Sequence, residues 1–270
     1  MGETGAPELL CEKLEDGIVR ITLNRPKARN TVSFAMWERF SEVLNEIEQG
    51  TPPKALILQG AENYFSNGGD VKLPPSRGSG ALSLAARLEM GQRIIRRLRD
   101  LPSPTIAAVE GGAFGVSWSL ALACDIILAA EDARFGAPFL QFGLVPDGGS
   151  SWFLTRRIGR ARAAEIIFSG RTLEAPEALS LGLVSRIVAK GTAEDEALAL
   201  ASGMGGSGNR HAVELTKRLI QQSEEGDLAG NHALELAFCQ ICQAGEEVPR
   251  AREMFKQQAA ARAAAKAREK

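Results

Sequence analysis

The sequence predicts an α/β fold that continues into a helical C-terminal region, and three observations carry this prediction. Short apolar or β-branched runs alternate with segments of helical periodicity between residues 18 and 188, a pattern typical of parallel strands joined by crossover helices. The apolar run at 105–109 breaks at paired glycines and resumes as an apolar helix near Val116, so a strand leads directly into a helix. From Thr192 onward the periodicity is helical.

The size and charge of the chain exclude several classes of function. A length of 270 residues suits one large domain with an appendage, and we expect a core over residues 1–195 and a helical region over 196–270. With 32 basic residues scattered among 33 acidic ones and one Tyr, no nucleic-acid partner is expected. The sequence has neither a leader-like start nor about 18 consecutive apolar residues, which predicts no membrane partner and a cytoplasmic location. The four cysteines have no framework or metal-ligand spacing, so no metal is expected.

The first crossover is predicted between residues 18 and 59. Residues 18–23 alternate and are β-branched, which indicates a strand, and 55–59 form a short apolar run typical of a covered strand. Between them, 33–49 has an apolar face at helical spacing, with Thr31 or Ser33 as the N-cap. The apolar positions of this helix are Phe34, Trp37, Phe40, Val43, Leu44 and Ile47.

Glycines follow the second strand, and a second long helix follows them. Gly68 and Gly69 stand where the chain should leave the sheet, and glycine permits close approach of the backbone to a ligand. Residues 73–80, with two prolines and two glycines, are predicted to be a mobile loop over that point. Residues 81–100 predict a helix that ends before Pro102. Its expected buried face consists of Leu84, Leu88, Ile95 and Leu98.

The remaining elements are read from the same periodicities. A strand is expected at 125–130 and a last one at 184–188. Helices are expected from residue 151 with a break at Gly159, at 176–181, at 212–222, at 228–244 and at 248–266.

Gly69 and Val116 are candidates for a pair of oxyanion donors. The first N–H groups of a helix have no partner within it and lie at the positive end of its dipole, so the Val116 N–H can stabilise a developing negative charge. Gly69 also follows a glycine and begins a new segment, and two such donors are what an enolate-stabilising site requires. The alternative is that both glycine pairs only fill tight turns.

Asp147 is the candidate general base. Phe139, Phe142, Leu144 and Val145 lie close to it in the sequence, and if they surround it, desolvation raises the pKa of its carboxyl toward that of a working base. The alternative is a solvated turn, because Pro-Asp-Gly is also a turn signal.

Two other classes of site have weaker support. The segment 115–119 does not match the G-x-S-x-G elbow of a hydrolase, and both histidines lie in the helical appendage. The glycines at 111–115 do not match the G-x-G-x-x-G dinucleotide fingerprint.

Several motifs, in order along the chain, resemble those of the crotonase superfamily, the enoyl-CoA hydratases and isomerases. They include Asn-Arg-Pro at 24–26 and Gly-Gly-Asp at 68–70. The full set lies at 23–30, 65–72, 109–115, 123–126, 135–136, 143–146 and 178–184. The resemblance implies a crotonase-like fold of repeated ββα turns, a homotrimer or a hexamer built as a dimer of trimers, and a C-terminal region used for oligomerisation and the acyl pocket.

The resemblance also implies an acyl-CoA thioester substrate of the kind found in fatty acid metabolism. Coenzyme A is then part of the substrate, and no separate cofactor is expected. Gly69 and Val116 would supply the oxyanion N–H groups, with the adenosine side against Lys27, Ala28 and the segment after Gly68. The substrate-binding residues implied are Lys27, Ala28, Ser66, Asn67, Gly68, Asp70, Val71, Lys72, Gly115 and Phe139.

The departures from the family pattern favour one reaction. Family hydratases carry two glutamates, and this chain has Ser119 and Phe139 at those places. Asp147 resembles the acid of the Δ3,Δ2-enoyl-CoA isomerases and the phenylacetate-pathway isomerases, where one carboxylate moves a proton. The sequence therefore predicts an acyl-CoA double-bond isomerase. An atypical hydratase and a non-catalytic acyl-CoA-binding protein stay as alternatives, and chemistry like that of the 4-chlorobenzoyl-CoA dehalogenases ranks lower because 81–100 contains no histidine.

Overall fold

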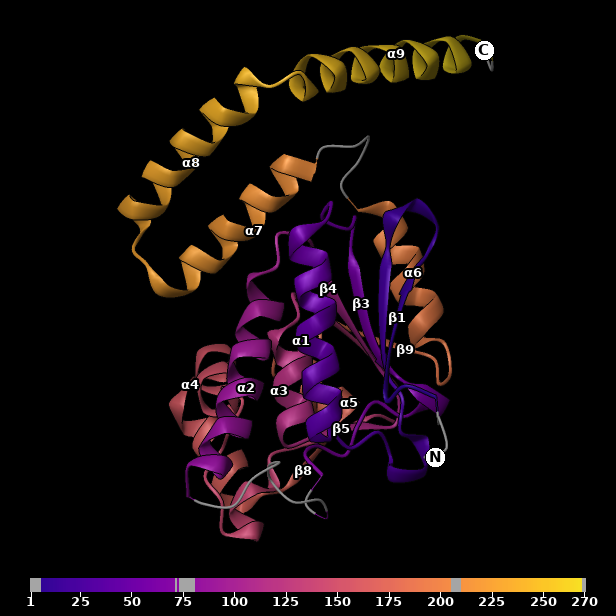
Figure 1. The fold of residues 1–270 in the computed structure, drawn as a ribbon. Coiled ribbons are helices and arrows are strands. Elements are labelled where there is room, and N and C mark those ends of the chain that lie inside the picture. Colours follow the sequence, from indigo (N-terminus) through magenta and orange to yellow (C-terminus); the bar gives the residue numbers. More distant parts are fainter. Residues whose placement is uncertain (1–5, 71, 73–80, 205–209, 269–270) are drawn as a thin grey trace. The chain divides into compact units, whose positions relative to one another are not determined.

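The structure is a computed structural model that describes residues 6–70, 72, 81–204 and 210–268 (Figure 1). The chain divides into two compact units, Met1–Met204 and Gly205–Lys270. The predicted loop at 73–80 lies outside the described residues.

A six-stranded sheet forms the centre of the first unit, in the order β1-β2-β3-β4-β6-β9. Its strands are β1 (Leu9–Lys13), β2 (Val19–Leu23), β3 (Leu56–Gly60), β4 (Thr105–Val109), β6 (Ile126–Ala130) and β9 (Arg186–Val188). Only β1 is antiparallel to its neighbour, and the other four pairings are parallel. The predicted crossover from β2 to β3 is thus confirmed, whereas β1 adds an edge strand that the periodicity did not predict.

Three helices cover one face of this sheet. They are α1 (Phe34–Gln49), α2 (Ala81–Asp100) and α3 (Val116–Ala123). The Ser33 hydroxyl caps α1 by accepting a hydrogen bond from the Met36 N–H at 3.0 Å. Of the two N-caps considered from the sequence, Thr31 and Ser33, the structure thus shows Ser33. All eight residues of α3 are buried, because this helix lies between the sheet and its neighbours α2 and α4.

The predicted buried face of α2 needs one correction. Ile95 and Leu98 are buried together with Ile94, whereas Leu88 is 43% exposed in this structure. Leu88 instead lines a small cavity together with Trp37 of α1. The predicted Leu84 side chain lies outside the part of the chain whose side chains the structure describes.

The helix α6 (Ala193–Gly203) covers the opposite face of the sheet, as Figure 1 shows. Small side chains of α6 allow it to lie close to the strands. The helix and the sheet bury an apolar cluster between them. It includes Ala193, Ala197 and Ala201 from the helix and Ile57, Ile106, Ala108 and Leu128 from the sheet. Because α6 packs on the sheet, the first unit extends to Met204.

A second, three-stranded sheet and its flanking helices complete the first unit. The strands β5 (Gly112–Phe114), β7 (Arg134–Gly136) and β8 (Thr172–Glu174) pair in the order β5-β7-β8. Short 3-10 turns lie at Glu15–Gly17, Pro26–Ala28, Ala61–Asn63 and Pro138–Phe142. The helices are α4 (Ser150–Ser169) and α5 (Ala175–Ser180), and the predicted break within α4 is confirmed by the non-helical Gly159 (φ 78°, ψ 162°).

The second unit contains the helices α7 (Arg210–Glu225), α8 (Leu228–Ala244) and α9 (Glu247–Arg268). α8 is capped by Asp227, whose side chain accepts a hydrogen bond from the Gly230 N–H at 2.7 Å. Within the described residues of the chain, no helix has the length and apolar character that crossing a membrane requires.

Candidate active site

Two loops that are distant in sequence are held side by side by backbone hydrogen bonds. The Ser66 N–H donates to the Gly112 carbonyl at 3.0 Å, and the Phe114 N–H donates to the Ser66 carbonyl at 3.1 Å. The Ser117 hydroxyl, from the first turn of α3, donates to the same Ser66 carbonyl at 2.7 Å. The segment that continues to Gly69 is therefore fixed against the start of α3.

The backbone around Gly69 directs its N–H away from Val32. The Val32 N–H donates to the Gly68 carbonyl at 2.8 Å, and the Asp70 N–H donates to the Val32 carbonyl at 3.0 Å. In this parallel bridge the flanking residues bond to Val32, so the N–H of Gly69 points to the opposite side. Gly68 has to be glycine, because its φ is +97° and a Cβ would lie 2.6 Å from the Phe114 carbonyl oxygen.

Val116 is the first residue of α3. The backbone conformation of the preceding Gly115 sets the direction of the Val116 N–H. Gly115 has φ 55° and ψ −130°, a conformation that favours glycine and turns the chain from β5 into the helix. A Cβ on Gly69 would lie 3.8 Å from Val116 Cγ1, so the two donor residues are neighbours. Among the described residues, neither N–H has a hydrogen-bond acceptor.

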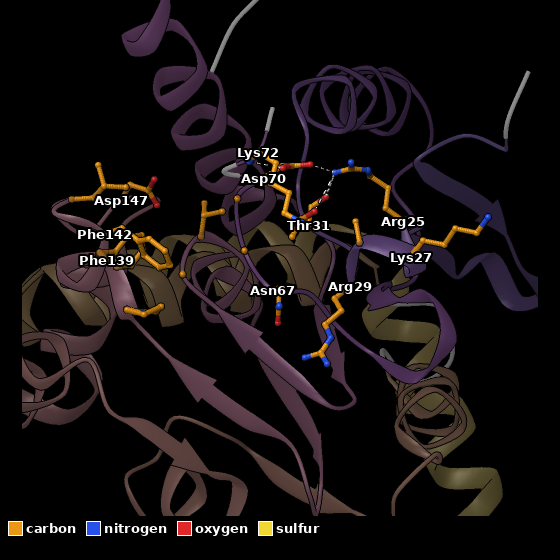
Figure 2. Close-up of a pocket in the computed structure, with 17 residues that line it drawn as sticks. Arg25, Lys27, Arg29, Thr31, Asn67, Asp70, Lys72, Phe139, Phe142 and Asp147 are labelled. Carbon is orange, nitrogen blue, oxygen red and sulfur yellow. Dashed lines mark hydrogen bonds and ion pairs between the residues drawn. The ribbon is translucent and has the colours of Figure 1, made fainter. Parts of the chain in front are cut away.

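Both donor residues and Asp147 line one cavity of about 630 Å³. Figure 2 shows Asp147 beside Phe139 and Phe142 at one side of this pocket, and Arg25 with Asp70 at the other. The lining residues described are Arg25, Lys27, Ala28, Arg29, Thr31, Asn67, Gly68, Gly69, Asp70, Lys72, Gly115, Val116, Pro138, Phe139, Phe142, Leu144 and Asp147.

The surroundings of Asp147 differ from the apolar enclosure considered from the sequence. Phe139 is buried, but Phe142, Leu144 and Val145 are 62%, 54% and 78% exposed. Phe142 ends a 3-10 turn that is capped by the left-handed Gly143, and Leu144 and Val145 follow this cap. Asp147 itself is half-buried, and its Oδ1 atom is shielded from solvent. Asp147 therefore faces a partly covered cavity.

Two buried serines hold the backbone of Asp147. Its carbonyl accepts hydrogen bonds from the Ser150 N–H at 3.0 Å and from the Ser150 hydroxyl at 2.9 Å. The Ser119 hydroxyl lies 3.2 Å from the same carbonyl oxygen. Ser119 is fully buried, and it is not among the described residues that line the cavity.

An ion pair stabilises the segment that carries Gly69. Arg25 Nη1 lies 2.8 Å from Asp70 Oδ2 and also donates to the Thr31 carbonyl at 2.8 Å. The other carboxylate oxygen of Asp70 accepts a hydrogen bond from the Lys72 N–H at 3.0 Å. The Arg25 and Asp70 side chains are 17% and 8% exposed, so the pair is largely removed from water. The Asp70 carboxylate thus links the Lys72 backbone to Arg25.

Three exposed cations line the cavity, and Figure 2 shows two of them, Lys27 and Arg29, on the side away from Asp147. Lys27, Arg29 and Lys72 are all exposed, and Arg29 lies over the Tyr64 ring at 5.5 Å from its centroid. Burial raises the pKa of the Tyr64 hydroxyl, which therefore stays protonated and donates to Asn67 Oδ1 at 2.5 Å. Cations in this arrangement can pair with phosphate groups.

The cavity brings together most of the residues predicted from the sequence. Three of them, Gly69, Val116 and Asp147, are the predicted catalytic residues. The predicted binding residues on its wall are Lys27, Ala28, Asn67, Gly68, Asp70, Lys72, Gly115 and Phe139. Ser66 lies beneath the wall, where its hydroxyl accepts a hydrogen bond from the Gly68 N–H at 3.1 Å. Val71 lies outside the described residues.

Sequence reasoning did not identify four lining residues as part of the site. They are Arg25, Arg29, Thr31 and Pro138. Phe142 and Leu144, which the sequence placed near Asp147, also line the cavity. The only available signal for Arg25 and Arg29 was their place in the motif at 23–30, because nothing local indicates that Arg25 meets Asp70. Among the described residues, no group of three or more His, Cys, Asp or Glu side chains could hold a metal ion.

Comparisons of the sequence and of the structure with known proteins point to the same family. The model of the family "Enoyl-CoA hydratase/isomerase" matches residues 13–262. The chain is 33% identical to the 1,2-epoxyphenylacetyl-CoA isomerase of Escherichia coli over 82% of its own length and 85% of the relative. It is 31% identical to the 2,3-dehydroadipyl-CoA hydratase of the same organism, over 89% of its own length and 92% of that relative. An enoyl-CoA hydratase structure from Bacillus anthracis superposes with a TM-score of 0.88 at 29% identity, covering 93% of this chain and 96% of that one. This likeness confirms the predicted fold.

Proposed function

Since the chain belongs to the enoyl-CoA hydratase/isomerase family, we propose that it is an acyl-CoA double-bond isomerase that converts a 3-enoyl-CoA into the conjugated 2-enoyl-CoA. The observation that carries this proposal is the shared cavity of Asp147, Gly69 and Val116. It offers the Asp147 carboxylate and two backbone N–H groups without acceptors among the described residues, while the other lining carboxylate, that of Asp70, is paired with Arg25. A proton shift next to a thioester needs these groups and no others.

In the proposed mechanism the Asp147 carboxylate removes a proton from C2 of the acyl chain. The electrons move toward the thioester oxygen, and the N–H groups of Gly69 and Val116 stabilise the resulting dienolate oxygen. The protonated Asp147 then delivers the proton to C4, and the double bond closes between C2 and C3. The enzyme returns to its starting state without any net gain or loss of atoms.

The chemistry of two neighbouring positions supports an isomerase over a hydratase. Adding water to a 2-enoyl-CoA needs groups that activate the water and protonate C2. Phe139, which lines the cavity, has no proton to transfer. The Ser119 hydroxyl is engaged with Ser150 at 2.6 Å and with the Asp147 carbonyl. Of these two positions and Asp147, only Asp147 carries an acid.

The proposed ligand is coenzyme A bound as the thioester. The exposed cations Lys27, Arg29 and Lys72 support this assignment because they line the cavity and offer positive charge to its phosphates. Assembly as a trimer or as a dimer of trimers and a cytoplasmic location belong to the same proposal, and both rest on the sequence resemblance.

The test supplies a 3-enoyl-CoA and a 2-enoyl-CoA in separate assays. We expect the wild type to increase the absorbance of the conjugated thioester from the first substrate, and Asp147→Asn to lose this activity by about 10²–10⁴-fold. Hydration of the 2-enoyl-CoA that survives in Asp147→Asn would contradict the proposal and favour a hydratase. Binding of both substrates without turnover by the wild type would favour a non-catalytic protein.

A further inference from the structure

A buried pair of hydroxyl groups lies directly beneath the turn that carries Asp147. Ser119 belongs to α3 and Ser150 is the first residue of α4, and their side chains are 0% and 1% exposed. The two Oγ atoms are 2.6 Å apart. Each of them also lies within hydrogen-bond distance of the Asp147 carbonyl oxygen, at 3.2 Å from Ser119 and 2.9 Å from Ser150.

The number of hydroxyl protons in the pair decides how many hydrogen bonds it can donate to the Asp147 carbonyl. Each hydroxyl can donate one proton and can accept further hydrogen bonds. If Ser119 donates to Ser150, then Ser150 donates to the Asp147 carbonyl, and the reverse arrangement serves equally well. In both arrangements the carbonyl receives one O–H in addition to the Ser150 N–H. The two serines are therefore interchangeable donors to one acceptor.

The turn also packs tightly on the same side. Gly148 has φ +60°, and a Cβ placed on it would lie 2.9 Å from Ser119 Cβ and 2.9 Å from Ile95 Cδ1. The residue after Asp147 thus rests on α3 and α2 with no space between them. A base has to stay within a fraction of an ångström of its productive position, and a displacement of about 1 Å can cost about 10²-fold in rate.

We propose that the Ser119–Ser150 hydroxyl pair is the positioning device of Asp147, and that it acts on catalysis only through the placement of that carboxylate. For its catalytic consequence this inference rests on the isomerase function proposed above. Neither serine is among the described residues that line the cavity, so neither is expected to touch substrate. Family hydratases carry a glutamate at the position of Ser119. In this chain the residue at that position instead supports another acid, Asp147.

The main experiment compares Ser119→Ala, Ser150→Ala and the double variant with the wild type. Because either hydroxyl can replace the other, each single variant is expected to lose less than about threefold in kcat. The double variant is expected to lose about 10–100-fold in kcat. KM should stay within about twofold, since the cavity walls are unchanged. In an Asp147→Asn background the double serine change should cost nothing further, because residues that act as a unit are not additive.

The matched control is Ser103→Ala. Ser103 is also buried and its hydroxyl donates to a backbone carbonyl, that of Pro53, at 2.6 Å. It lies between α2 and β4 and does not line the cavity. This variant should lose stability comparable to one serine variant and keep the wild-type kcat. A loss of kcat in proportion to stability in all variants, including Ser103→Ala, would overturn the proposal.

Amide hydrogen exchange provides a readout that does not depend on the reaction. In the double variant we expect faster exchange confined to the peptide covering residues 146–152, and in Ser103→Ala no change there. Unchanged exchange and unchanged kcat in the double variant would overturn the positioning role while leaving the isomerase proposal intact. A wild type without isomerase activity would instead remove the proposed function, and the exchange result would still decide whether the serines hold the turn.

Discussion

Replacing Arg25 by Met tests whether the ion pair with Asp70 maintains the site. The variant keeps the aliphatic part of the side chain but removes the guanidinium group that lies 2.8 Å from the Asp70 carboxylate, which is 8% exposed. Removing one partner of a buried pair costs about 3–5 kcal/mol, and the 17% exposure of Arg25 places the expected loss of unfolding free energy near the lower end, about 3 kcal/mol.

The same change should affect catalysis through Gly69. The Asp70 N–H bonds to the Val32 carbonyl and its carboxylate to the Lys72 N–H, so a shift of Asp70 should move the adjacent Gly69, the proposed oxyanion donor. Loss of one such donor costs about 10²–10³-fold in kcat, which sets the upper limit of the effect. Urea unfolding and kcat are measured on the same preparations.

A matched control is available on the helices α1 and α2. Arg97 lies 2.8 Å from Glu48, but these side chains are 26% and 42% exposed, so Arg97→Met should cost at most about 1 kcal/mol. It should leave kcat unchanged. If Arg25→Met destabilises the protein no more than Arg97→Met, or keeps full kcat, then the pair does not hold the donor and the reasoning is refuted.

Two further predictions concern a comparison of two separate glycines, Gly148 and Gly159, and an exposed ion pair. Gly148→Ala should lower stability by about 1–3 kcal/mol and should also lower kcat, because its Cβ would meet Ser119 Cβ at 2.9 Å. Gly159→Ala is also at positive φ but would have no atom within 4 Å of its Cβ, so it should cost about 1–3 kcal/mol of backbone strain and leave kcat unchanged. Steady-state kinetics and urea unfolding check this, and equal kcat in the two variants would contradict it. Arg171 lowers the pKa of Glu177 chiefly by hydrogen bonding, so the stabilisation is present above the ordinary value of 4.5 and is lost as the pH falls. Arg171→Gln should therefore be less stable than the wild type at pH 6, with the difference shrinking below about pH 4.5, and a difference that grows toward low pH would show the opposite sign of coupling.

Much of the fold follows from periodicity, because burial of one helix face leaves a strong pattern in the sequence. The six buried positions of α1 include five of the six predicted, with Met36 in place of Phe34. Short elements left no such pattern. The three-residue strands β5, β7 and β8 are too short to alternate visibly, and β1 combines apolar residues with Glu12 and Lys13.

The residues of the candidate site that line the cavity could be named from the sequence where they carry a local signature. Gly69 and Val116 each follow a glycine at a change of element, and Asp147 stands alone in an apolar stretch. Contacts between distant segments had no such signal: Arg25 meets Asp70 across 45 positions, and Ser119 meets Ser150 across 31. The exposure of Leu144 could not be read from its hydrophobicity, because it depends on where the loop after Phe139 is directed.

The most direct test of the central claim measures kcat for a 3-enoyl-CoA with the wild type and with Asp147→Asn, alongside the affinity of each protein for coenzyme A. Asn keeps the size of the side chain and the backbone carbonyl that the serines hold, but it cannot accept the proton from C2. The account predicts equal affinity and a fall in kcat of about 10²–10⁴-fold. An Asp147→Asn enzyme that conjugates the double bond at the wild-type rate would contradict it.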